Sequence, residues 1–262
     1  MKNAMISALK ISGEVLLSHF NTAMEIKIKE TQSNIVTEAD IKSDEAIISV
    51  IKKQFPAHNI LSEESGLKDN GSKYTWVIDP LDGTSNFAAG IPWFGVLIAL
   101  FKDNTPIMGG AYLPVQEMMY VAEKGKGAFK NGKPLVMATD NKLVNSLCAF
   151  SMDYSEDEVF INLGIEMYRF IIKGSRNIRS TNSLMDFLFV AEGKFGLCVN
   201  LFTKVWDISA LGLIIEEAGG VMKDLKGMDI HFTMREEIID RNFPVIAGST
   251  NILDSMKEVF SY

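Results

Sequence analysis

The stretch WVIDPLDGTSNF, from Trp76 to Phe87, places Asp79 and Asp82 three residues apart, directly behind an apolar run. Asp-Pro and Asp-Gly are common turn pairs, so a turn that ends a buried strand is one interpretation. The other is a metal site at the carboxyl end of a strand, because carboxylates are the hard oxygen ligands that Mg²⁺ prefers. This stretch alone leaves both interpretations open.

Further acids stand at the ends of predicted elements, and each has a structural interpretation of its own. Asp40 would start a helix, with Thr37 as a possible capping partner. Glu63 and Glu64 would lie in a solvated loop, and Asp207 would cap the helix ISALGLIIEEAG. Together with DPLDGT, these acids form one constellation of carboxylates.

Two phosphate-handling motifs are incomplete. GAFKNGKP, from Gly127 to Pro134, matches a phosphate-binding loop until Pro134 replaces the Ser or Thr that would hold magnesium, and its setting predicts a hairpin. DPLDGT half-matches the Asp-x-Asp-Gly-Thr pattern of phosphotransferases, but Pro80 stands where the second aspartate is needed. Residues three apart on an extended segment do not share a face, so an aspartyl-phosphate mechanism is not expected.

Composition narrows the function classes. The chain has 262 residues, a hydrophobic content of 47% and a formal net charge of −7, which predict a globular protein and speak against nucleic acid or an anionic membrane as partner. The contexts of Cys148 and Cys198 predict buried free thiols in a reducing compartment. No apolar run approaches eighteen residues, so no membrane span is expected and the cytoplasm is the default location. The histidines at 19, 58 and 231 lack ligand-spaced partners and are expected to be structural.

The elements expected along the chain give a mixed fold. Helices are predicted over 3–22 and 40–55, followed by a β-rich middle with the runs YTWVID, WFGVLIALF, IMGGAYLP and EMMYVAEKG. From about 142, the strands SLCAF, GLCVN and PVIAGS alternate with helices over 155–173, 183–192, 207–218 and 250–260. That alternation predicts an α/β second half, with two subdomains that meet near 140 and share a wide interface.

Five segments carry a resemblance to one family. In order, ILSEES, WVIDPLDGTSNFAAGIP, GKGAFKNGKP, IRSTNSLMDFLFVAEG and VWDISALGLIIEEAGG resemble the inositol monophosphatase family of magnesium-dependent, lithium-sensitive phosphatases, whose superfamily includes fructose-1,6-bisphosphatase. The resemblance spans about residues 29 to 250. It implies an α/β protein, an α+β part followed by an α/β part, layered as an αβαβα sandwich of the sugar phosphatase type. An N-terminal subdomain, 1–140, would carry most metal ligands, and a C-terminal subdomain, 141–262, would supply Asp207 and substrate contacts.

The resemblance also implies roles for the acids. Two or three Mg²⁺ ions are expected, the first held by Glu63, Asp79 and the Leu81 carbonyl, the second by Asp79, Asp82 and Asp207. Such cations are needed, because carboxylates 4 Å apart repel by roughly 4 kcal/mol per pair at an effective dielectric near 20. Pro80, with its fixed φ, would help to present these ligands toward one point.

The remaining implied roles concern water, phosphate and substrate. Thr84 paired with Asp40, with Glu63 close by, would activate a metal-bound water for direct attack. Gly83 and Thr84 would open a helix whose N–H groups bind the phosphate. The implied substrate contacts are Asp82, Ser183, Asn200 and Asp207.

Substrate and partners are implied less fully. The expected substrate is inositol monophosphate or a related small sugar or polyol phosphate, and the NF after DPLDGTS favours that branch over the nucleotidase branch. Asn200 stands where inositol-cleaving relatives carry a glutamate, and Asn182 stands where they carry a glycine. Alternatives are a fructose-1,6-bisphosphatase, a 3′-phosphonucleotide or histidinol-phosphate phosphatase, or a regulatory protein associated with RNA polymerase or the ribosome. A homodimer without direct nucleic acid binding is expected.

Overall fold

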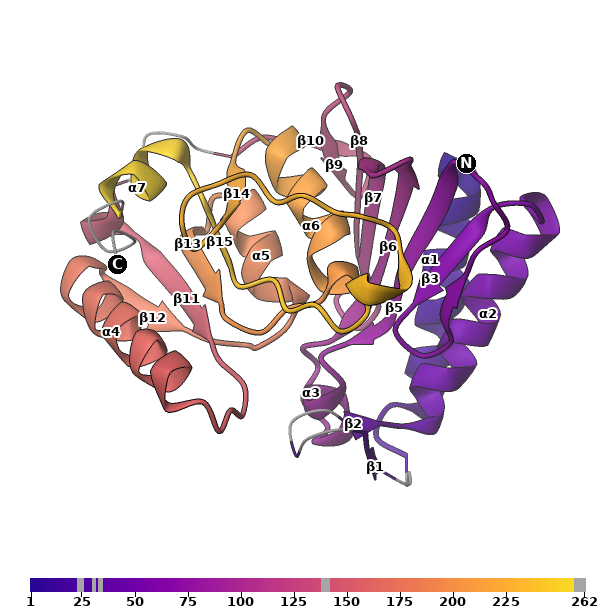
Figure 1. Cartoon of the computed structure of the whole chain (residues 1–262), viewed down its shortest axis with the longest axis horizontal. Coiled ribbons are helices and arrows are strands. Elements are labelled where there is room, and N and C mark those ends of the chain that lie inside the picture. The colour runs from indigo at the N-terminus through magenta and orange to yellow at the C-terminus, as the bar shows by residue number, and fades with distance from the viewer. Residues whose placement is uncertain (23–25, 30–31, 33–34, 138–141, 257–262) are drawn as a thin grey trace.

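The computed structural model describes residues 1–22, 26–29, 32, 35–137 and 142–256. Its elements form five layers, in which two sheets are separated by one helical layer and flanked by two others (Figure 1). This arrangement confirms the predicted αβαβα sandwich. The helices are α1 (Lys2–His19), α2 (Glu38–Gln54), α3 (Thr84–Ala88), α4 (Glu158–Gly174), α5 (Leu184–Ala191), α6 (Val205–Glu217) and α7 (Thr250–Ser255). None of the helices in the described ranges is long and apolar enough to cross a membrane.

The first sheet has eight strands and takes up the β-rich middle of the chain. Its neighbours pair antiparallel except β3 and β5, which are parallel. In spatial order the strands are β10 (Lys133–Leu135), β9 (Ala128–Lys130), β8 (Met118–Glu123), β7 (Thr105–Leu113), β6 (Gly95–Lys102), β5 (Tyr74–Asp82), β3 (Asn59–Ser62) and β4 (Gly66–Lys68). β9 and β10 form the hairpin predicted in place of a phosphate-binding loop, and its turn residues Asn131 and Gly132 both have positive φ.

The second sheet has five strands and is mixed rather than parallel throughout. β11 runs parallel to both neighbours, whereas β15 is antiparallel to β13 and β14. In spatial order the strands are β12 (Asn177–Arg179), β11 (Leu147–Ser151), β13 (Phe195–Asn200), β15 (Val245–Gly248) and β14 (Val221–Asp224). Beside α3 lies a separate pair, β1 (Lys27–Ile28) with β2 (Ile35–Val36).

The predicted helices are present, with ends that differ by a few residues. α1 ends at His19 rather than 22, because Phe20 is already extended. α2 begins at Glu38 because Thr37 caps it, and the Thr37–Asp40 pair forms the capping box that the spacing predicted. The last predicted helix is described only as α7, since residues 257–260 of its expected range lie outside the described residues.

The largest hydrophobic cluster contains side chains from both halves of the chain. It joins Leu61 and Val77 of the first sheet to α5, α6 and Val245 of the second sheet, so the middle helical layer is packed on both faces. The expected wide interface is thus one continuous core. The boundary expected near 140 falls among residues outside the described ranges, and a division into 1–140 and 141–262 stays a prediction. Cys148 and Cys198 are buried free thiols, as predicted.

α6, which carries Asp207, lies unusually close to the first sheet. A Cβ built on Gly109 of β7 would lie 2.7 Å from the carbonyl oxygen of Ala210 and 3.1 Å from its Cα. Backbone cannot retreat from such a contact as a flexible side chain can. Glycine at 109 therefore sets how near α6, which carries Asp207, comes to β7.

We expect Gly109→Ala to lower the free energy of unfolding by about 1–3 kcal/mol, the usual effect of overpacking a core. Chemical denaturation would measure it. The matched control is Gly212→Ala on α6, where the nearest atom to the added Cβ is the Met222 sulfur at 3.4 Å; there the helix propensity of alanine should leave stability equal or higher. Equal effects of the two substitutions would contradict the close-approach argument.

Candidate active site

A β-bulge explains how two aspartates three residues apart reach one cavity. On β5, Asp79 pairs with Leu97 and Asp82 pairs with Gly95, so three steps on β5 match two on β6. The extra residue lies at Pro80–Leu81, and a bulge is one of the few places within a sheet where proline is tolerated. Both carboxylates consequently line the same cavity. The expectation from simple alternation, that these two residues do not share a face, is wrong at this point.

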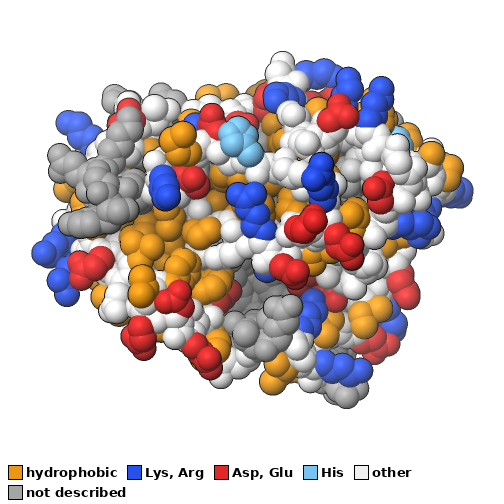
Figure 2. Space-filling view, in the orientation of Figure 1, with side chains coloured by type: hydrophobic (Ala, Val, Ile, Leu, Met, Phe, Trp, Pro, Cys, Tyr) orange, Lys and Arg blue, Asp and Glu red, His pale blue; other side chains and the backbone are white. Residues whose placement is uncertain are grey.

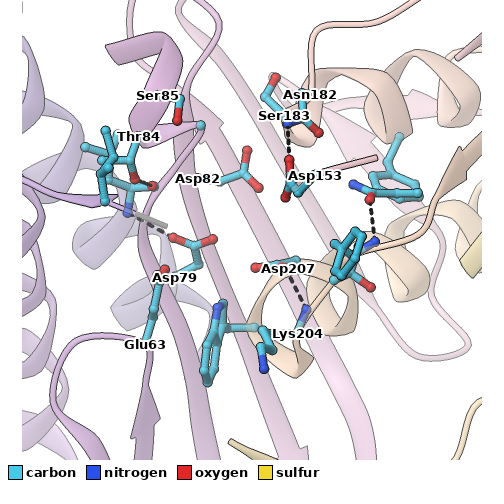
Figure 3. Close-up of a pocket in the computed structure, with 18 of the residues that line it drawn as sticks. Glu63, Asp79, Asp82, Thr84, Ser85, Asp153, Asn182, Ser183, Lys204 and Asp207 are labelled. Atoms are coloured by element: carbon cyan, nitrogen blue, oxygen red, sulfur yellow. Dashed lines mark hydrogen bonds between the residues drawn. The ribbon is translucent and has the colours of Figure 1, made fainter. Parts of the chain in front are cut away.

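Asp207 completes a cluster of three acids. Asp79, Asp82 and Asp207 each contribute one carboxylate oxygen to a group of three atoms that lie within 4.8 Å of one another. Asp207 occupies the first turn of α6 and accepts a hydrogen bond from the Lys204 N–H at 2.7 Å, so it belongs to the cap of this helix although Lys204 is the N-cap residue. Figure 3 shows the three carboxylates pointing toward one another from β5 and α6.

Backbone N–H groups hold the two β5 carboxylates in place. The Leu81 N–H donates to Asp79 at 3.0 Å. The Leu184 N–H, at the start of α5, donates to Asp82 at 2.6 Å. The first bond lies within the bulge, and the second connects the bulge to α5 in the middle helical layer. Both partly offset the free-energy cost of burying negative charge.

Glu63 lies beside Asp79, just past the end of β3, and is paired with a lysine. Lys29 Nζ lies 3.0 Å from Glu63 and 2.6 Å from Glu64. Burial alone would lower the pKa of Lys29, but the charges of both glutamates raise it above its usual value. Burial raises the pKa of Glu64 to about 7. The lysine thus supplies a positive charge at the edge of the acidic cluster.

Thr84 is hydrogen-bonded to Asp40 behind the cavity wall. Thr84 Oγ1 lies 3.1 Å from Asp40 Oδ1 and 2.9 Å from the Leu81 carbonyl oxygen, so its one proton has two acceptors. The other oxygen of Asp40 accepts from the N–H and hydroxyl of Thr37 at 2.8 and 2.6 Å. Asp40 is 1% exposed, and burial raises its pKa despite these bonds. One carboxylate therefore caps α2 and orients Thr84.

Gly83 lets the chain turn from β5 into α3. Its φ of 84° lies in the left-handed region, and an added Cβ would meet the Trp93 carbonyl oxygen at 2.6 Å. α3 then begins at Thr84, where the sequence predicted a helix start. Only glycine fits both conditions at this position.

Two buried serines support the bulge from the outer helices. The Ser12 hydroxyl on α1 lies 2.6 Å from the Ser43 hydroxyl on α2, and Ser43 donates to the Pro80 carbonyl at 2.7 Å. Both serines are fully buried. This chain of hydrogen bonds gives the Pro80 carbonyl, within the bulge, a buried partner. Isolated serines in amphipathic helices are common, so this chain could not be predicted from the sequence.

The cavity has a volume of about 390 Å³, and nine of the ten site residues expected from the resemblance line it. They are Glu63, Asp79, Leu81, Asp82, Gly83, Thr84, Ser183, Asn200 and Asp207. Asp40 lies behind Thr84. The lining residues of the described chain include no Cys or His, so the donor set is carboxylate and carbonyl oxygen, which suits a hard cation such as Mg²⁺.

The sequence reasoning missed several lining residues. Asp153 and Tyr154 follow β11, and Lys204 precedes α6. Asn182, with a positive φ of 49°, donates from its side chain to Asp153 at 2.8 Å. An acid just past the apolar strand SLCAF was the available signal for Asp153, of the same kind as the one that drew attention to Asp79.

Burial and mutual repulsion raise the pKa values of the clustered acids. Burial, followed by the charge of Glu63, raises the pKa of Asp79 well above its usual value. Burial and the charge of Asp82 do the same for Asp207, and the pKa of Asp82 itself rises to about 7. Without cations, this cluster binds protons that free carboxyl groups would release.

The fold, the acidic cluster and the match to a family model agree on one class of protein, the hydrolases of phosphoric monoesters. Residues 1–253 match the model of the inositol monophosphatase family, and the chain belongs to this family.

Individual relatives cover most of the chain. A protein of Aquifex aeolicus called fructose-1,6-bisphosphatase/inositol-1-monophosphatase is 37% identical over 220 residues, which are 83% of this chain and 83% of that protein. The Nus factor SuhB of Pasteurella multocida is 32% identical over 236 residues, 89% of this chain and 88% of that protein. A solved structure of an IMPase from Thermotoga maritima has 26% identity and a TM-score of 0.85, covering 99% of this chain and 97% of that one.

The raised pKa values predict an unusual pH dependence for the metal-free protein. The folded cluster holds protons to about pH 7, the pKa of Asp82, whereas unfolded carboxyl groups release them near pH 4. The folded state therefore binds more protons in this window, and the free energy of unfolding should fall as pH rises from about 4 to about 7. Denaturation in a chelating buffer at several pH values measures this slope. Saturating Mg²⁺ should flatten it, and a metal-free protein that gains stability across the window would contradict the assignment.

Proposed function

We propose that the protein hydrolyses the phosphomonoester of a small polyol or sugar, with inositol monophosphate as the first candidate, and that it requires Mg²⁺. The observation that carries this proposal is the group of Asp79, Asp82 and Asp207 oxygens within 4.8 Å, beside the Thr84–Asp40 hydrogen bond. Membership of the inositol monophosphatase family supports it. The name of the Aquifex aeolicus relative supports fructose-1,6-bisphosphate as a second substrate to test.

The oxygen donors divide into two groups around Asp79. Glu63, Asp79 and the Leu81 carbonyl would hold one Mg²⁺, and Asp79, Asp82 and Asp207 a second. When bound, the cations supply positive charge that stabilises the transferring phosphoryl group. A third ion, inhibition by lithium, a homodimer and a cytoplasmic location stay predictions from the resemblance.

Thr84 and Asp40 provide a path for a proton. Thr84 Oγ1 donates toward Asp40 Oδ1 and keeps its lone pairs for the proton of an attacking water. Glu63 lines the same cavity and would orient that water. Gly83 and Thr84 line the cavity where α3 begins, and their N–H groups would bind the ester phosphate. Asp82, Ser183, Asn200 and Asp207 would then contact the alcohol part of the substrate.

A regulatory role is the second candidate, since a relative called a Nus factor is 32% identical. Acidic and basic side chains are interspersed over the face shown in Figure 2, without a basic field suited to nucleic acid. Phosphate release from inositol, sugar, nucleotide and histidinol phosphates with Mg²⁺ separates the candidates. Release from none of them would reject the phosphatase proposal and favour a binding role.

Asp82→Asn and Asp207→Asn should each reduce Mg²⁺-dependent turnover by at least about a hundredfold, because each removes a charged metal ligand. An amide can still accept the N–H bonds from Leu184 and Lys204, so metal-free stability near pH 8 should be unchanged or higher. Turnover at saturating Mg²⁺ and thermal unfolding measure the two effects. The control is Glu166→Gln on the exposed face of α4. Near-wild-type turnover by either variant would reject its assignment as a ligand.

Thr84→Val should reduce kcat by about 10²–10⁴-fold with little change in Mg²⁺ affinity, because the hydroxyl handles a proton rather than a metal. Thr84→Ser keeps the hydroxyl and should stay within about tenfold of wild type. This pair is cleaner than Asp40→Asn, which would also weaken the cap of α2. A variant whose Mg²⁺ titration shifts strongly while kcat at saturation is unchanged would place Thr84 among the metal contacts instead.

A further inference from the structure

One wall of the cavity carries an acid outside the three-carboxylate cluster. Figure 3 shows Asp153 with Asn182 and Ser183 across the cavity from Thr84 and Glu63. The proposed proton path and phosphate contacts lie on the Thr84 side. Asp153 lies outside the candidate cation site, so its negative charge would repel a phosphate. An ester bound in this cavity would therefore turn its alcohol part toward Asp153.

The fold places Asp153 beside the proposed substrate contact Asn200. β11 and β13 are parallel neighbours, and Ser151 pairs with Asn200 at their carboxyl ends. Asp153 lies two residues beyond Ser151. Side chains at neighbouring parallel strand ends meet at the same edge of a sheet, and both residues line the cavity.

The hydrogen-bonding capacity of these two residues differs. The Asn200 side-chain oxygen accepts from the Phe202 N–H at 3.0 Å and so stabilises the turn after β13. The amide N–H₂ group is then the part of Asn200 that can donate to a ligand. Asp153 Oδ1 accepts from the Asn182 amide at 2.8 Å. Asp153 Oδ2 has no hydrogen-bond or ion-pair partner among the residues that the structure describes. This wall therefore offers a donor at Asn200 and an anionic acceptor at Asp153.

Asn182 is held independently of Asp153. Its backbone N–H donates at 3.1 Å to Asp186, a buried carboxylate that also accepts from the Thr181 N–H. The side chain of Asn182 can be removed without releasing this turn, and glycine tolerates its positive φ.

We infer that Asp153 is a specificity-determining residue that accepts hydrogen bonds from hydroxyl groups on the alcohol part of the substrate, and so selects phosphate esters with adjacent free hydroxyls. The inference rests on the proposed function and names the substrate class for the same site. A carboxylate oxygen has lone pairs for two donors, which matches a vicinal diol. Asp153 Oδ1 already accepts a hydrogen bond from a neutral donor, the side-chain amide of Asn182. Substrate hydroxyl groups are neutral donors of the same kind.

The test compares inositol 1-phosphate with phenyl phosphate, whose alcohol part carries no hydroxyl. Asp153→Asn should lower kcat/KM for inositol 1-phosphate by about 5- to 30-fold, the difference between a charged and a neutral hydrogen bond, and leave phenyl phosphate within about twofold. Saturating Mg²⁺ is used throughout, because Asp153 also contributes to the negative field at Asp82 and Asp207. Asp103→Asn, in a remote turn where asparagine tolerates the φ of 56°, controls for loss of one negative charge.

Asn182→Gly separates direct contact from loop positioning. If Asp153 contacts substrate, this variant keeps the preference for inositol 1-phosphate within about threefold. If Asp153 acts only by holding Asn182, both variants lose activity on both esters in parallel, and the inference fails. A larger loss on histidinol phosphate than on inositol 1-phosphate in Asp153→Asn would assign the carboxylate to an ammonium group and overturn the hydroxyl assignment.

Failure of this inference and failure of the proposed function are distinguishable. A wild-type protein that releases no phosphate from phenyl phosphate or any other ester rejects the function. An active wild type whose ratio of kcat/KM values is unchanged by Asp153→Asn rejects only the role of Asp153.

Discussion

Electrostatic repulsion between buried carboxylates is the constraint on which the rest of the structure depends. Three acids with oxygens within 4.8 Å of one another, and a fourth beside them, oppose the folding of the metal-free chain. At an effective dielectric near 20, each close pair costs roughly 4 kcal/mol. Backbone N–H groups of Leu81, Leu184 and Lys204 each donate to one of these carboxylates, and retained protons remove part of the remaining charge. The protein therefore holds in place a group that is stable only with cations or protons.

The devices that hold this cluster come from separate parts of the chain. The bulge at Pro80–Leu81 aims two acids from one strand, and Ser12 and Ser43 secure it from the outer helices. The third acid arrives on α6, whose distance from β7 is fixed by Gly109. Because one hydrophobic core spans both sheets, these supports act on a common frame. The site is consequently a property of the whole sandwich rather than of one motif.

Apolar periodicity predicted the main helices, because it is a local signal. The layered sandwich and the convergence of the acids on one site came from the resemblance to the family. The sequence did not predict the bulge, since pairing register depends on β6 and not on DPLDGT itself. Asp153 was missed because its role depends on which strand lies next to β13. The short strands β12 and β14 carry too few residues for a pattern. The alternation of strands and helices predicted an α/β second half but not its strand directions, which are mixed because β15 pairs antiparallel to β13.

Asp40 links the N-terminal end of α2 to the proposed proton path through Thr84. Its two oxygens divide between the cap of α2 and the hydroxyl of Thr84, so fraying of the first turn of α2 would also disorient the proton acceptor. Thr37 directly follows β2, and β2 ends with Val36 beside the cavity-lining Ile35. A substitution that loosens this entry to α2 would therefore shift Asp40 and, through it, the Thr84 hydroxyl. One carboxylate thus couples the N-terminus of α2 to the proposed proton path through Thr84.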